Sequence, residues 1–162
     1  MVIDIAHLQQ WTGRTEQVHD QVTVVPMNAL GALLDRDDPP AAPGDDLPPL
    51  WHWLYFLPVP RQSMIGLDGH PKRGGFLPPV DLPRRMWAGS QLEFLRPLKA
   101  GSAITRLSRI ERVEHKQGRT GDLVFVNVKH EVSDAAGVAV VERQDIVYRD
   151  HPASGEKPAA SQ

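Results

Sequence analysis

Residues 123–132, LVFVNVKHEV, carry a valine at almost every second position. Successive side chains of a strand point to opposite faces, so this period of two places one set of valines on a single face. β-Branched side chains also favour strands over helices. The stretch therefore predicts a core strand with these core residues: Val124, Val126, Val128 and Val132.

The flanking segments extend this strand into a meander. Residues 138–149, VAVVERQDIVYR, start and end in strand formers, and the Asp-Ala-Ala-Gly run at 134–137 supplies turn chemistry for a hairpin. Upstream, apolar residues spaced by three between Ile104 and Val113 fit a helix about as well as a strand. Residues 116–121, KQGRTG, are typical of a hairpin loop, so an antiparallel meander favours a strand over residues 104–115.

Prolines divide the chain. Most of the 15 prolines fall between Pro39 and Pro97, whereas residues 98–151 contain none. Proline lacks the amide hydrogen that a sheet needs, so we expect an irregular middle followed by a sheet. Before that middle, residues 17–25 predict a strand, and Pro26 suits the first turn of a following helix. The helix is apolar on nearly every side up to Leu34, so we expect it to be buried in an α+β fold, with the sheet wrapped around it.

Composition restricts the class of protein. The chain has 162 residues, 18 basic and 20 acidic side chains and no cysteine. It is long enough for one domain, expected over residues 1–150 with a flexible tail at 151–162. The net charge of −2 provides no overall field for a polyanion, and no apolar run approaches a membrane helix. We expect a soluble, cytoplasmic protein that binds neither nucleic acid nor membranes and has no metal site.

Four stretches together resemble a known family. They are LPPLWHWLYFLP at 47–58, DGHPKRGGFLPPVDLPRRMWAGSQLEFLRPLKAGS at 68–102, GRTGDLVFVNVKHEV at 118–132 and ERQDIVYR at 142–149. The chain resembles the MaoC-like thioester dehydratases of the hot-dog fold. Within them it is most similar to the amino-terminal half of the mesaconyl-CoA hydratases and of the fungal type of 3-hydroxyacyl-thioester dehydratase. This resemblance implies a hot-dog fold over nearly the whole chain.

The resemblance also implies what this chain lacks. In the broader family an aspartate precedes the catalytic histidine by five residues, and none of the seven histidines here has an aspartate at that position. Hydration of an enoyl thioester needs a base, an acid and donors for the enolate oxygen. The resemblance therefore implies a lyase subunit that is not competent alone, paired with a second MaoC-like chain that carries the catalytic residues.

Two groups of residues are candidates for binding the thioester. The aromatic run contributes Trp51, His52, Trp53 and Tyr55, which fit either an acyl-pocket wall or plain core. The basic run contributes Lys72, Arg73, Arg84 and Arg85, followed by Met86; its guanidinium groups suit the phosphates of coenzyme A or phosphopantetheine, or form an ordinary solvated loop. That carrier is expected as part of the substrate, with no separate cofactor. For catalysis the single candidate is His52, which has no identifiable carboxylate partner in the sequence.

Two other functions stay open at this point. A homodimeric hot-dog thioesterase needs a carboxylate near the thioester carbonyl, for which Asp35, Asp81 and Glu93 are candidates. A module that binds acyl thioesters without catalysis needs none. Fold resemblance alone does not decide between them, because one fold hosts several chemistries.

Overall fold

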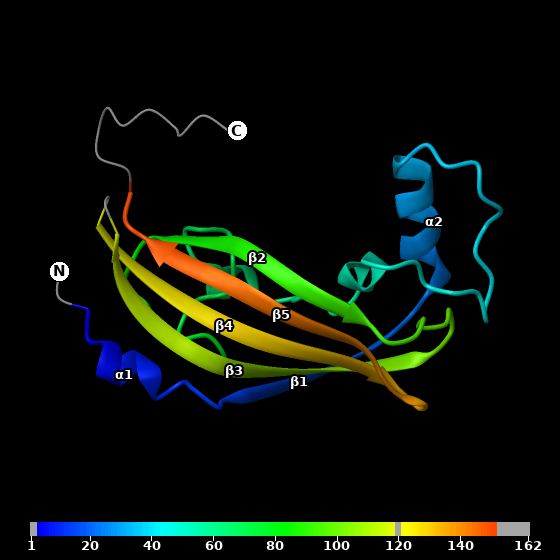
Figure 1. Ribbon diagram of the computed structural model, residues 1–162. Helices are drawn as coiled ribbons and strands as arrows, with labels where there is room; N and C mark the ends of the chain where they lie inside the picture. Colours follow the sequence, from blue (N-terminus) through cyan, green and yellow to red (C-terminus); the bar gives the residue numbers. More distant parts are fainter. Residues whose placement is uncertain (1–2, 119–120, 152–162) are drawn as a thin grey trace.

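One antiparallel sheet forms the body of the computed structural model, which describes residues 3–118 and 121–151 (Figure 1). Its strands are β1 (Thr15–Gln21), β2 (Arg84–Phe94), β3 (Ala103–Gly118), β4 (Gly121–Asp134) and β5 (Gly137–Arg149). Their order is β1-β3-β4-β5-β2, so the predicted meander lies at the centre of the sheet. The prediction of a strand over residues 104–115 is confirmed.

The predicted turn between β4 and β5 is also confirmed. Asp134 ends β4, and its side-chain carboxylate accepts a hydrogen bond from the backbone amide of Ala136 at 2.8 Å. Gly137 then begins β5 with a backbone φ of +107°, a conformation that residues with a Cβ rarely adopt. The other hairpin loop lies partly outside the described residues, between Gly118 and Gly121.

The helices of the described residues are short. They are α1 (Ile5–Gln9), α2 (Val24–Leu33) and the 3-10 helices η1 (Trp51–Leu54) and η2 (Gln62–Met64). In the described part of the chain, no helix has the length and apolar character that crossing a membrane would take. The aromatic run, for which the sequence left a pocket wall or plain core open, contains the helical turn η1.

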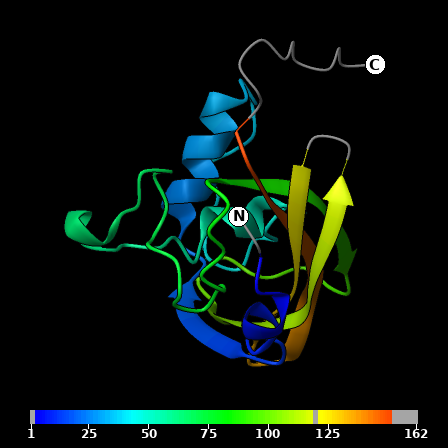
Figure 2. The same ribbon diagram turned by 90° about the vertical axis from the view of Figure 1, so that its left-hand side faces the viewer.

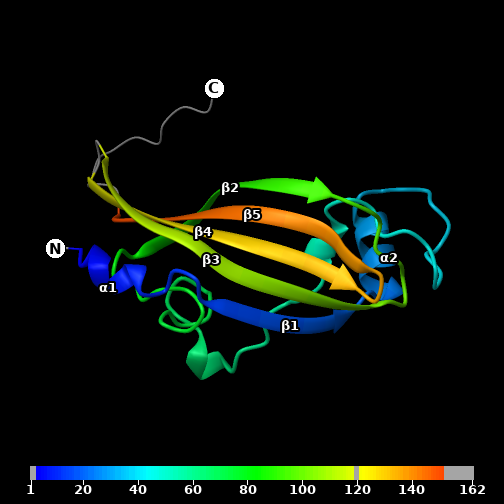
Figure 3. The same cartoon turned by 60° about the horizontal axis from the view of Figure 1, so that its bottom comes forward.

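Helix α2 forms where it was predicted, but the prediction of its burial is wrong. Pro26 lies in its first turn, and only Met27 is buried, whereas Val25 is 72% exposed and Leu33 is 81% exposed. The helix lies beyond one end of the sheet instead of across it (Figures 1 and 3). The sheet therefore does not wrap around α2 in this chain, and the central part of the sheet face is left to other segments.

Strand β2 was not predicted, because it belongs to the proline-rich middle of the sequence. It occupies a proline-free interval between Pro83 and Pro97 and pairs with β5 at the edge of the sheet. A shift of register between Trp87 and Gly89 interrupts this pairing. The edge position suits a strand with prolines close to both ends, because such a strand needs a partner on one side only.

The sheet is curved (Figure 2), and it buries apolar side chains mainly on one face, which we call the inner face. It carries the even-numbered residues of β4, and the four valines predicted as core are each at most 2% exposed. Two apolar clusters lie at opposite ends of the strands, one around Ile104 and Val140, the other around Ile110 and Tyr148. The predicted tail at 151–162 lies outside the described residues, apart from His151.

Candidate active-site cavity

A band of polar side chains crosses the inner face between the two apolar clusters. We call this band the polar belt; it consists of Ser90 of β2, Arg106 and Ser108 of β3, His130 of β4, and Glu142 and Gln144 of β5. Strand register brings these residues together. Ser108 is paired with His130, and His130 in turn with Glu142, while Ser90 is paired with Gln144. The belt is thus a product of the sheet, assembled from positions far apart in the sequence.

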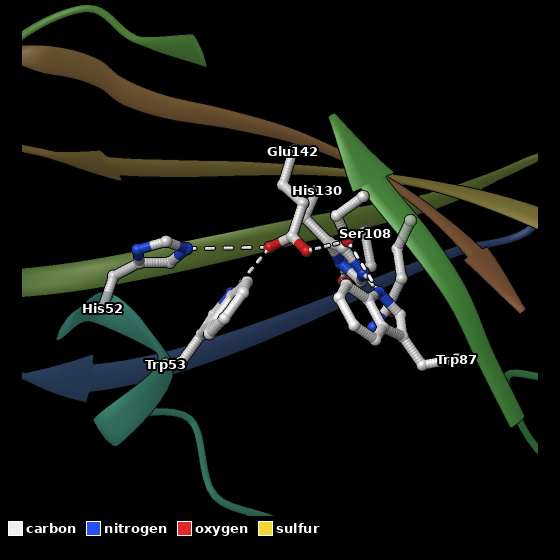
Figure 4. A network of polar contacts seen from close by, with 8 residues as sticks. His52, Trp53, Trp87, Ser108, His130 and Glu142 are labelled. Carbon is white, nitrogen blue, oxygen red and sulfur yellow. Dashed lines mark hydrogen bonds and ion pairs between the residues drawn. The ribbon is translucent and has the colours of Figure 1, made fainter. Parts of the chain in front are cut away.

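Glu142 is the centre of a hydrogen-bond network (Figure 4). The residue is 6% exposed, and its carboxylate accepts hydrogen bonds from Trp53 Nε1 at 3.0 Å and from Ser90 Oγ at 2.7 Å. Ser90 in turn accepts one from Trp87 Nε1 at 3.0 Å. His52 Nε2 lies 3.6 Å from Glu142 Oε2, close enough for an ion pair when the ring is protonated. This network ties η1 to β5 and β2.

The environment of Glu142 keeps it ionised. Burial acts to raise the pKa of its carboxyl, but the approach of His52 and the hydrogen bonds from Ser90 and Trp53 outweigh burial and lower the pKa to about 2. A carboxylate with so low a pKa is a weak proton acceptor near neutral pH. Its evident role is to hold the side chains around it.

His130 is held by different partners. Its Nδ1 lies 2.7 Å from Ser108 Oγ and its Nε2 lies 3.3 Å from Gln144 Oε1. Burial lowers the pKa of His130 below its usual value, only partly opposed by the hydrogen bond to Gln144. The ring is therefore neutral at physiological pH, as a hydrogen-bonding member of the belt.

A cavity of about 500 Å³ lies over the belt. Its floor includes Val128, Val132 and Ile146 of the inner face, and its walls include Phe56 and Phe76 from the segment before β2. Most of this lining is apolar, with the belt as its polar stripe. An apolar pocket with a few convergent polar groups is the usual form of a small-molecule site. No residue of α2 lines this cavity.

The aromatic candidates divide between this cavity and other places. His52, Trp53 and Tyr55 line it, and Tyr55 donates its hydroxyl hydrogen to the backbone oxygen of Thr23 at 2.6 Å. Trp51 points elsewhere and lines a separate pocket beside α2, with the Arg36 guanidinium 5.5 Å from its ring centre. The structure thus brings three of these four residues together.

The basic candidates lie outside the cavity, at the loop before β2 and the start of that strand. They are Lys72, Arg73, Arg84 and Arg85, and the candidate Met86 that follows them also lies outside the cavity. Arg73 and Arg85 both pair with Asp68, at 3.5 and 3.3 Å. Their role as phosphate ligands stays a prediction.

Arg73 also has a structural role. Its guanidinium donates hydrogen bonds to the backbone oxygens of Val80, Leu82 and Pro83 and lies 5.2 Å from the ring centre of Tyr148. The side chain is 20% exposed, so this arginine fixes the loop that leads into β2.

Replacing Arg73 by methionine is expected to lower the free energy of unfolding by about 2 kcal/mol, because three carbonyl oxygens lose a charged donor. Urea denaturation of the purified chain measures this change. The matched control is Lys72→Met, which removes the neighbouring exposed cation and should leave the midpoint unchanged. Equal midpoints for both variants would show that Arg73 has no structural role.

Sequence reasoning missed most of the belt. The sequence did contain a signal for these residues. His130, Glu142 and Gln144 lie at the even-numbered positions of their strands, where the alternating pattern otherwise carries apolar residues. A polar residue on the buried face of a strand needs a partner, and such positions are candidates for a site.

The thioesterase candidates Asp35, Asp81 and Glu93 are exposed and line no part of this cavity. Within residues 3–118 and 121–151 no cluster of potential ligands could hold a metal ion.

Comparison with known proteins gives relatives for both sequence and fold. The family model for hydroxyacyl-thioester dehydratase type 2 matches residues 50–162. The mesaconyl-C(4)-CoA hydratase of Chloroflexus aurantiacus is 45% identical over 142 residues, which cover 86% of this chain and 50% of that protein. The chain thus spans about half the length of this curated relative.

Two solved structures share the architecture. One is from the ChsH1-ChsH2 complex of Mycobacterium tuberculosis, with a TM-score of 0.63, 16% identity and coverage of 93% of this chain and 91% of that one. The other is the R-hydratase PhaJ1 of Pseudomonas aeruginosa, with a TM-score of 0.50, 13% identity and coverage of 98% and 95%. The likeness confirms the predicted hot-dog fold.

Proposed function

Because this chain belongs to the hydroxyacyl-thioester dehydratase type 2 family of MaoC-like hot-dog proteins, we propose that it is the substrate-shaping subunit of a heteromeric hydratase or dehydratase. It acts on an enoyl or 3-hydroxyacyl thioester of coenzyme A or a carrier protein. The catalytic aspartate and histidine are provided by a partner chain.

The observation that carries this proposal is the open inner face. The cavity over the polar belt has about 500 Å³ and an apolar lining, which suits the acyl part of a thioester. The floor of this cavity is the inner face of the sheet, so an acyl group bound there would lie against Val128, Val132 and Ile146. This chain therefore contributes shape and polar contacts to a site.

The proton transfers require groups that this chain does not supply. The spacing of aspartate and histidine typical of the family is absent from the sequence. Glu142 is buried in the cavity, but with its pKa near 2 it is a poor base for activating water. His52 lies 3.6 Å from the Glu142 carboxylate, which Trp53 and Ser90 also hold by hydrogen bonds, and the partners of His130 are Ser108 and Gln144, neither of them a carboxylate.

The relatives support a partner of similar fold. The mesaconyl-C(4)-CoA hydratase is about twice as long as the matched region, which leaves room for a second unit in that protein. The structural neighbour from Mycobacterium tuberculosis was solved as a complex of two different chains. A division into a catalytic unit and a substrate-shaping unit therefore accounts for the missing acid and base.

The test starts from affinity isolation of the protein from its native cells, with mass spectrometry of whatever remains bound in stoichiometric amount. We expect one small partner with an Asp-x4-His motif. Coexpression should give a complex that hydrates an enoyl-CoA, whereas each chain alone should be inactive. The matched control is the same complex with the partner's motif histidine replaced by alanine.

Two results would contradict the proposal. One is recovery of a homodimer that hydrates the enoyl-CoA without a partner. The other is hydrolysis of acyl-CoA by the isolated chain, which would identify a thioesterase.

A further inference from the structure

A second pocket adjoins the cavity over the polar belt. It has a volume of about 330 Å³ and lies beside the end of β2. Its lining includes these apolar residues: Leu47, Pro48, Phe94, Leu95, Leu98 and Val140. Arg96 also lines it, but the guanidinium of Arg96 already binds the carboxylate of Asp134 at 2.9 Å. This space, which we call the end pocket, therefore offers mainly apolar contacts.

Strand register places the end pocket next to the cavity. Val132 of β4 belongs to the cavity floor, and the residue opposite it on β5 is Val140, which lines the end pocket. Glu142, two residues further along β5, lines the cavity. Alternate residues of a strand share a face and lie about 7 Å apart. The two spaces therefore follow one another along the inner face of the sheet.

His52 stands between these two spaces. Among the described residues that line them, His52 is the one that they share. Its Nε2 lies 3.6 Å from Glu142 Oε2 in the cavity, and its ring centre lies 6.0 Å from that of Phe94 in the end pocket. Figure 4 shows the ring at one end of the network around Glu142, away from Trp87 and Ser108. Because His52 is only 4% exposed, its imidazole ring is a buried partition.

The contacts of His52 indicate that the bulk of its ring matters. Its Nε2 is buried and makes no hydrogen bond within the described residues, since 3.6 Å is too long for one. Glu142 has two hydrogen-bond donors of its own in Trp53 and Ser90. The ring of His52 instead packs among aromatic side chains, with the Trp53 ring centre 5.7 Å away. Its place in the fold is thus that of a wall.

We propose that His52 ends the acyl pocket and so sets the longest acyl chain that the site accepts. This inference rests on the proposed function and names a residue that determines its specificity. An acyl chain that lies along the inner face meets the imidazole ring before it reaches the end pocket. Removal of the ring joins the two spaces, and the apolar lining of the end pocket then favours burial of an alkyl chain.

The test measures binding of saturated acyl-CoAs from butyryl-CoA to decanoyl-CoA, in steps of two carbons. Calorimetric titration uses the protein together with the partner isolated with it, or alone where it has none. For the unmodified protein, each step should strengthen binding about 10-fold until the chain meets His52, and the next step should bring no gain. His52→Ala should move that limit to a longer chain, with a further gain of about 10-fold for the first added step.

Two control variants separate the bulk of the ring from its charge. His52→Phe keeps an aromatic ring but cannot pair with Glu142, and it should keep the limit of the unmodified protein. His115→Ala makes the same truncation on β3, outside both spaces, and should also keep that limit. A variant that changed only the stability of the protein would not move the limit.

Thermal denaturation shows whether His52→Ala is folded. If it is not, His52→Val takes its place in the same titrations, because valine keeps an apolar side chain in η1 but no ring. It should move the limit in the same direction as His52→Ala.

The outcomes that contradict the inference are distinct. Binding by the unmodified protein that strengthens at every step up to decanoyl-CoA would overturn it and leave the proposed function intact. An unchanged limit in the folded variant without the ring, or an equal shift of the limit in His52→Phe, would also overturn it. Binding of none of these thioesters would overturn the proposed function and this inference together.

Discussion

Replacing Gln144 by tryptophan is expected to weaken acyl-thioester binding about 100-fold, the loss that corresponds to closing much of a small-molecule site. Gln144 lies at the middle of the belt, and its side chain reaches His130 from β5. A tryptophan there extends into the cavity, where it meets space instead of packed side chains. Calorimetric titration with butyryl-CoA measures the change.

The fold should tolerate this substitution, because overpacking is costly only where no space exists. Arg143→Trp is the matched control: Arg143 is the preceding residue of β5, is exposed and points to the opposite face. It adds the same bulk outside the cavity and should leave the affinity unchanged. Unaltered binding in Gln144→Trp would mean that the acyl group does not enter this cavity.

Glu142 is expected to make the stability of the protein depend on pH in the acidic range. Its pKa falls from an ordinary value of 4.5 to about 2 on folding. Because the folded-state pKa is lowered, the stabilisation is fully present above the unfolded-state pKa and is lost as the pH falls towards 2. A shift of this size corresponds to roughly 3 kcal/mol, and because residue Glu142 is only 6% exposed, solvent screens its charge little.

Glu142→Gln should therefore lower the free energy of unfolding at pH 7 by about 3 kcal/mol and flatten its decline between about pH 5 and pH 2. Urea denaturation over this range measures both effects. Glu93→Gln, which neutralises an exposed carboxylate on β2, is the matched control and should keep the slope of the unmodified protein. An equally steep decline in Glu142→Gln would show that other carboxylates cause the acid sensitivity.

The sheet could be predicted from sequence because its signal is local. The valines between Val124 and Val132 alternate in a pattern that only an extended strand turns into one apolar face. The turn that ends at Gly137 could also be predicted, because the Asp-Ala-Ala-Gly run is typical of a turn and glycine readily adopts the positive φ found there. Strand β2 was missed because the prolines around it dominated the local composition.

The position of α2 and the composition of the polar belt could not be predicted from local sequence patterns. An apolar helix indicates burial somewhere, but its place depends on contacts with segments such as η1 that lie many residues away. Of the cavity residues, the aromatic run at 47–58 pointed to His52, Trp53 and Tyr55, whereas Glu142 acquires its partners only when β5, β2 and η1 meet. Long-range pairing decides both features, and no local pattern encodes it.

The strand order has a consequence for the way the chain folds. Strands β3, β4 and β5 are neighbours in the sequence as well as in the sheet, whereas β1 and β2 reach its edges from earlier parts of the chain. Contacts between residues close in sequence form faster, because less chain entropy is lost in closing the loop between them. We expect the central meander to assemble first and the edge strands to dock afterwards. The cavity, whose walls come from the segment before β2, is then completed last.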